Sequence, residues 1–165
     1  MRPNLLFVFF IFTTLTACER HNESDEITLP PLNEQIIGEW EVKAMKGTAT
    51  SFHYEIGKVE KDTWTGDSIT GNLVFSEYGE LNLDLKYHRH FQCASWNCPY
   101  PKVYGIIHQR YYQYTIDNAS TFTFDDGTSQ VSVGLRNRTT NSLTLNYCEE
   151  QFGGEICYEI ILQKR

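Results

Sequence analysis

The sequence has little of several features that mark common classes of protein. Its longest apolar run, Leu5–Phe12, is too short to span a bilayer. Lys and Arg number 14 against 21 Asp and Glu, and this acidic balance argues against nucleic acid or anionic headgroups as partners. There is no Gly-x-Ser-x-Gly, no His-Glu-x-x-His and no phosphate loop, so we expect neither an enzyme nor a bound cofactor. No helical apolar period persists for three turns, which argues against a helical fold.

The N-terminus carries the pattern of an export signal. Arg2 precedes the apolar run, and small residues precede Cys18. Residues 15–18 read Leu-Thr-Ala-Cys and closely resemble the lipobox of bacterial lipoproteins. The resemblance implies that residues 1–17 are a signal peptide and that Cys18 is lipidated and anchors the chain in the cell envelope. By the sorting habit of that family, Glu19 favours the outer membrane, on a side that the sequence leaves open. Ordinary secretion is the alternative.

The rest of the chain divides into a tether and one domain. Residues 18–35 are polar and acidic and have no apolar period, so we predict a flexible, lipid-anchored tether. Residues 36–165 alternate between apolar and polar, which predicts an all-β domain, an antiparallel up-and-down meander of about eight strands. Residues 57–69, with Trp64, are expected to form a polar insertion, and residues 93–102 a loop. The expected strands are 37–45, 50–56, 70–76, 80–91, 104–116, 119–125, 128–136, 142–149 and 155–163.

Three hairpins can be given a register, because a slip of one residue would turn the apolar face to the wrong side. A left-handed Gly79 is expected in the second hairpin, and a two-residue Asp126-Gly127 turn in the third. The expected pairs are Tyr147 with Tyr158, Leu145 with Ile160, Leu143 with Leu162, Phe75 with Leu81, Leu73 with Leu83, and Phe122 with Val131.

Four cysteines follow Cys18, and an even number in an exported chain predicts disulfides. Pairing Cys148 with Cys157 agrees with the register of the last hairpin, and Cys93 and Cys98 are paired by their proximity in sequence. A four-thiolate zinc site is the alternative. Its usual spacing is two short pairs, whereas eight residues separate Cys148 from Cys157, so we expect no metal there.

The start of the domain resembles a known family. Gly38-x-Trp40 at the entry to the first strand resembles the lipocalin signature. Residues 73–81 and 142–147 are similar to segments of the lipocalin-like lipoproteins of Gram-negative bacteria. The resemblance implies a lipocalin-like β-barrel with Trp40 closing one end and a small hydrophobic or amphipathic molecule bound inside.

Alternation along 80–91 and 104–116 predicts which polar side chains point into the barrel. His88 and His90 point outward on the first of these strands, and His108 points inward on the second, so a three-histidine metal site is not expected. Inward guanidinium groups among tyrosine hydroxyls would suit a carboxylate or another anionic head. An internal salt bridge, or a bulge that turns these residues outward, is the alternative. The candidate ligand-binding residues are Tyr87, Arg89, His108, Arg110, Tyr112 and Tyr114, with an apolar tail expected among Phe75, Leu83 and Leu85.

The sequence thus predicts a membrane-anchored, lipocalin-like lipoprotein that binds a small hydrophobic or amphipathic molecule in its barrel. The alternative is a β-rich surface lipoprotein that acts through protein–protein interaction. It follows from the many Phe and Tyr residues, because large side chains at the inward positions of a small barrel can fill it completely.

Overall fold

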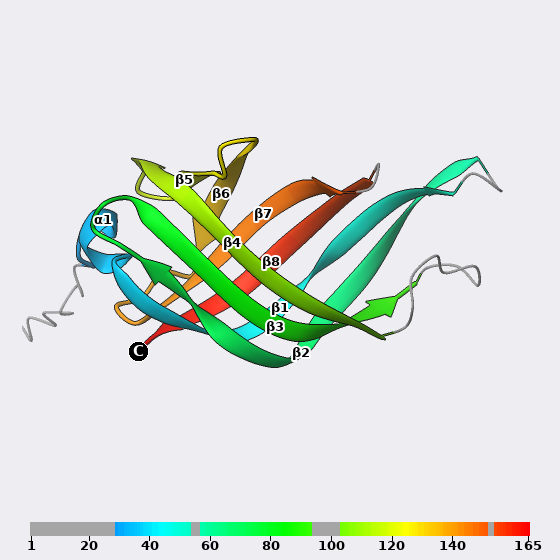
Figure 1. The fold of residues 1–165 in the computed structure, drawn as a ribbon, viewed down its shortest axis with the longest axis horizontal. Helices are drawn as coiled ribbons and strands as arrows, with labels where there is room; N and C mark the ends of the chain where they lie inside the picture. Colours follow the sequence, from blue (N-terminus) through cyan, green and yellow to red (C-terminus); the bar gives the residue numbers. More distant parts are fainter. Residues whose placement is uncertain (1–28, 54–56, 94–102, 152–153) are drawn as a thin grey trace, which may run out of the picture.

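The computed structural model describes residues 29–53, 57–93, 103–151 and 154–165. Each strand pairs antiparallel with the next along the chain, and β8 pairs with β1, so the sheet closes into a barrel (Figure 1). This confirms the all-β antiparallel meander predicted from the sequence. The elements are α1 (Leu32–Gln35), β1 (Gly38–His53), β2 (Lys58–Phe75), β3 (Glu80–Gln92), β4 (Val103–Asn118), β5 (Thr121–Asp125), β6 (Gln130–Arg136), β7 (Ser142–Gln151) and β8 (Gly154–Lys164).

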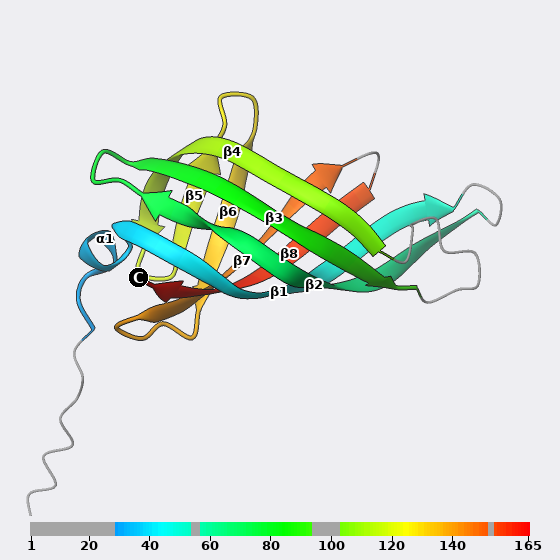
Figure 2. The ribbon, with the colours of Figure 1, turned by 60° about the horizontal axis from the view of Figure 1, so that its bottom comes forward.

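The wall of the barrel is uneven in length. β1 and β2 have 16 and 18 residues, whereas β5 and β6 have 5 and 7. The β1–β2 hairpin extends past the β7–β8 hairpin at the end opposite α1, and the β5–β6 hairpin leans outward (Figures 1 and 2). The wall is therefore tall on one side of the barrel and low on the other.

The predicted polar insertion at 57–69 is wrong. Residues 58–75 form the single strand β2, and residues 38–45 and 50–53 of the strands expected at 37–45 and 50–56 both belong to β1, whereas residues 54–56 lie outside the described ranges. Trp64 lies on the inner face and is 1% exposed, with Asp62 buried on the same side. An inward carboxylate breaks the apolar alternation from which strands are predicted, so this half of β2 resembles a loop in the sequence.

The expected register holds for two of the three hairpins. The predicted pairs of β7 with β8 and of β2 with β3 are observed, and Gly79 has a φ of 79°. The third register is wrong by two residues, because Phe122 pairs with Val133 and not with Val131. The loop has four residues, and the Asp126 carboxylate accepts hydrogen bonds from two backbone N–H groups within it, at 2.8 and 2.9 Å. A slip of two residues keeps the same face inward.

One end of the barrel is closed by the helix and a tryptophan. Trp40 is fully buried, and its Nε1 donates to the Ile36 carbonyl at 2.7 Å. The Lys164 ammonium lies 5.6 Å from the centre of the Trp40 ring and donates to the Gln35 carbonyl at 2.8 Å. Leu32 is also buried, so the end of the segment predicted as a tether is part of the folded domain. No helix of the described ranges is long and apolar enough to cross a membrane.

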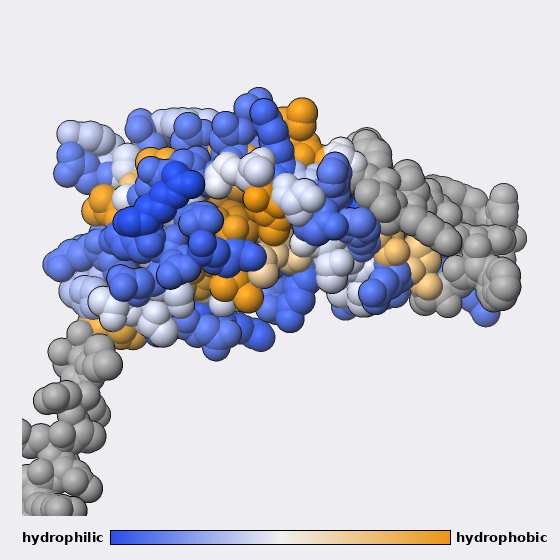
Figure 3. Space-filling model, turned by 90° about the horizontal axis from the view of Figure 1, so that it is seen from below, coloured by the Kyte–Doolittle hydropathy of each residue, from blue (hydrophilic) through white to orange (hydrophobic). Residues whose placement is uncertain are grey.

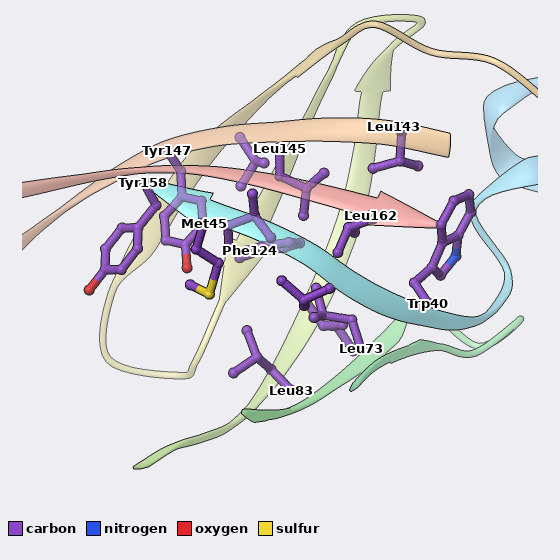
Figure 4. Packing of buried hydrophobic residues seen from close by; sticks show 14 of the residues in the cluster. Trp40, Met45, Leu73, Leu83, Phe124, Leu143, Leu145, Tyr147, Tyr158 and Leu162 are labelled. Carbon is purple, nitrogen blue, oxygen red and sulfur yellow. The ribbon is translucent and has the colours of Figure 1, made fainter. Parts of the chain in front are cut away.

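The core changes character along the barrel axis. From Trp40 to Leu83 the interior is filled with aliphatic and aromatic side chains, and toward the other end stand Tyr147 and Tyr158 (Figure 4). We call the part near Trp40 the closed half and the part around Tyr158 the open half. Hydrophilic residues cover much of the outer surface, with an apolar area near the middle of one face (Figure 3).

Candidate functional site

The barrel wall has an opening between β4 and β7. β5 pairs with β4 only from Gln113 onward, and β6 pairs with β7 only from Gly134 to Arg136. The first part of β4 and the last part of β7 therefore face each other without a strand between them. A cleft of about 420 Å³ occupies this opening. Its walls include Arg110 and Tyr112 from β4, Asp126 and Gln130 from the β5–β6 hairpin, and Glu149 from β7.

Arg89 is the central charged side chain of the open half. It is 4% exposed, and its Nη2 donates to the hydroxyls of Tyr87 at 2.8 Å and Tyr158 at 3.2 Å. Its guanidinium carbon lies 4.5 Å from the centre of the Trp64 ring, a cation–π distance. The Arg89 Nε has no hydrogen-bond partner, and no carboxylate of the described ranges lies within ion-pair distance of this guanidinium.

Tyrosine rings surround this guanidinium. Tyr158 stacks on Tyr147, with ring centres 4.8 Å apart, and meets the Trp64 ring edge-on at 5.4 Å. Burial raises the pKa of Tyr158 to about 12 and also raises the pKa of Tyr87. These hydroxyls therefore stay protonated at neutral pH, and they supply dipoles but no negative charge to Arg89.

His108 and Glu149 complete the polar interior. The His108 ring lies 6.4 Å from the ring of Tyr158. Burial lowers the pKa of His108, and the positive charges of Arg110 and Arg89 act in the same direction, against the raising effect of Glu149. The Glu149 carboxylate accepts a hydrogen bond from the Tyr112 hydroxyl at 3.4 Å, and this contact spans the opening between β7 and β4.

The six predicted ligand-binding residues do not all meet. Tyr87, Arg89, His108 and Tyr112 gather in the open half, as the alternation of β3 and β4 predicts. Arg110 lies at the rim of the cleft with its side chain 53% exposed, 4.0 Å from Asp126. Tyr114 lies nearer the closed half, where its hydroxyl donates to the Ser76 carbonyl at 2.7 Å and its ring contacts Phe75. The three residues expected around an apolar tail, Phe75, Leu83 and Leu85, are packed in the core.

Three residues of this site were missed in the sequence. Trp64 fell within the segment predicted as an insertion. Tyr158 pairs with Tyr147 in the predicted register, and that register places it inward beside Tyr147. Glu149 follows Tyr147 by two residues on β7, so the alternation already placed its carboxylate on the inner side.

The predicted disulfide between Cys148 and Cys157 is present and links β7 to β8 beside the opening. The Glu155 carboxylate lies near both sulfur atoms, but sulfurs joined in a disulfide are not the thiolates that bind metals. Cys98 and Cys18 lie outside the described residues, so the second pairing and the lipidation stay predictions.

No model of a known protein family matches the chain, and no curated protein matches it in sequence.

Proposed function

We propose that the protein is a lipid-anchored, lipocalin-like lipoprotein of the cell envelope that binds a small amphipathic molecule with an anionic head in the open half of its barrel. The observation that carries this proposal is the buried Arg89 guanidinium, to which the described residues offer hydroxyls and aromatic rings but no carboxylate. The anchor and the lipocalin-like character come from the sequence, and the ligand class comes from this site.

A guanidinium in this setting favours an anion. Removing an arginine from water costs several kcal/mol even after relaxation, and hydrogen bonds to neutral hydroxyls offset only part of this cost. A carboxylate or phosphate would bring an opposite charge and could accept from the unpaired Nε. The protonated hydroxyls of Tyr87 and Tyr158 could then turn to donate to the same oxygen atoms.

The opening between β4 and β7 supplies an entrance for such a molecule. Arg110 stands exposed at the rim, where a positive charge raises the local concentration of anions. A second cleft of about 530 Å³ lies between β6 and the last hairpin and is lined by Tyr147 and Tyr158, among others. An apolar group attached to the anionic head would lie in these clefts.

The packed closed half limits the size of the ligand. Leu83 and Leu85 are 1% and 0% exposed and sit among other fully buried side chains, which leaves no path toward Trp40 for a long chain. The site therefore favours a compact amphiphile or a short acyl chain over a long fatty acid.

The ligand proposal is tested with a fluorescent short-chain fatty-acid analogue bound to the purified full-length protein. Arg89→Met should abolish binding, and Arg110→Leu should weaken it without lowering Tm, because Arg110 is exposed. Arg136→Met is the matched control, because Arg136 is exposed on β6 outside the site and its loss changes the net charge equally. Equal binding by the Arg89 and Arg136 variants would contradict the proposal.

The anchor is tested separately by Cys18→Ala. We expect this variant to be found in the soluble fraction or to keep its signal peptide uncut, whereas the natural protein should sediment with membranes. Normal membrane anchoring of Cys18→Ala would contradict the lipoprotein part of the proposal and would leave the ligand site untouched.

A second candidate function is protein–protein interaction through the outer surface. The dense packing of the closed half and the apolar area on one face favour it (Figure 3). The probe experiment separates the two functions, because a surface-acting protein would not bind the analogue in a way that depends on Arg89.

A further inference from the structure

A carboxylate lies between two imidazoles on the outer face of the barrel. Asp67 of β2 has one oxygen 3.5 Å from His88 Nδ1 and the other 2.6 Å from His90 Nε2, both on β3. His88 and His90 are 56% and 37% exposed, and they point outward while Tyr87 and Arg89 point into the barrel. The three side chains are therefore at least partly exposed and separate from the interior site, although the His90 Nε2 atom itself is covered.

The strand geometry explains why these groups meet. Asp67 pairs directly with His88, and Thr65 pairs with His90, so the carboxylate lies opposite one imidazole and diagonal to the other. The register between β2 and β3 shifts immediately after Asp67, where Ser68 has a φ of 51°. A bulge of this kind re-aims the neighbouring side chain.

The other side of His88 is left free by a glycine. Gly105 of β4 pairs with His88, and a Cβ at this position would lie 3.7 Å from His88 Cδ2. A larger side chain would contact the imidazole. Because Gly105 has none, and because the surface around His88 is hollowed, the ring has room to rotate toward Asp67 and His90.

We propose that Asp67, His88 and His90 bind one divalent transition-metal ion, and that Zn²⁺ fits the set best. Two imidazole nitrogens and one carboxylate oxygen are a ligand set that zinc accepts, and a water molecule facing solvent completes the tetrahedron. Rotation of the two exposed rings would bring one nitrogen of each onto the ion, and any proton on that nitrogen would be released when the metal binds. The single negative charge of the carboxylate suits a cation better than an anion.

The proposal is tested by calorimetric titration of Zn²⁺ into the metal-stripped, full-length protein. We expect one ion per chain, and a loss of affinity of about tenfold or more in each of Asp67→Asn, His88→Asn and His90→Asn. Asp84→Asn is the matched control, because Asp84 is an exposed aspartate on the outward positions of β3 that does not contact the two histidines. It should bind Zn²⁺ as the natural protein does.

NMR of the histidine side chains gives a second measurement on the same samples. Zn²⁺ should shift the ring signals of His88 and His90 and leave those of the buried His108 in place. Absence of measurable binding, or unchanged affinity in the double variant His88→Asn/His90→Asn, would overturn the proposal. Binding that shifts only other residues would overturn it equally.

Discussion

Replacing Arg89 and its two hydroxyl partners with apolar side chains of similar size should stabilise the ligand-free barrel. The variant is Arg89→Met/Tyr87→Phe/Tyr158→Phe. Burying the guanidinium costs several kcal/mol. Each of its two hydrogen bonds offsets about 1.5–3 kcal/mol of this cost, and its cation–π contact with Trp64 offsets about 2 kcal/mol. Because gain and cost nearly cancel, a well-packed apolar replacement is expected to be neutral or to add about 1–4 kcal/mol to the free energy of unfolding.

Urea unfolding followed by circular dichroism measures this free energy. Arg89→Met alone is the informative intermediate, because it leaves two buried hydroxyls without their donor and should cost about 1–3 kcal/mol for each. The triple variant should therefore be more stable than the single variant. A loss of about 3 kcal/mol or more in the triple variant would refute the reasoning, since it would show that the guanidinium stabilises the empty barrel without a ligand.

Three further predictions concern stability. Removing the disulfide with Cys148→Ala/Cys157→Ala should lower the free energy of unfolding by about 2–3 kcal/mol on the chain-entropy model, as measured by urea unfolding. Burial lowers the pKa of His108 below its ordinary value of 6.5 in the folded protein. As the pH falls below about 6.5, the unfolded chain therefore gains a proton before the folded protein does, and folding stability is lost. His108→Gln should therefore flatten the fall in Tm between about pH 7 and pH 5, and an unchanged slope would assign the fall to other groups. Gly47→Ala should destabilise by about 1–3 kcal/mol in the same unfolding assay, because the new Cβ would lie 1.8 Å from the Cys157 carbonyl oxygen, whereas Gly134→Ala, whose Cβ meets nothing closer than 3.8 Å, is the control.

Alternation predicted the inner face of β3 and β4 well, because both strands carry aliphatic residues that mark the inward side. It placed Arg89 and His108 inside on that basis, and both are buried. Alternation could not predict whether neighbouring strands cover an inward-facing side chain. Arg110 has the inward parity of His108, but it lies where β4 has no neighbour on one side, so its side chain reaches solvent.

Two features of the chain could not be predicted, for different physical reasons. The first half of β2 resembles an insertion in the sequence because its inner face includes Asp62. The contact of Lys164 with the Trp40 ring was not predicted, because only the closing pair of β1 with β8 brings this lysine to the ring. Contacts that depend on closure of the barrel are long-range, and the pattern of one strand does not contain them.

Native mass spectrometry of the purified full-length protein tests the central claim most directly. The natural protein should carry a small anionic molecule that leaves on collisional activation, and Arg89→Met should carry none. Molecules bound through other contacts would appear in both proteins and cancel in the comparison. A natural protein that carries nothing beyond what Arg89→Met carries would contradict the claim that the buried guanidinium holds an anionic ligand.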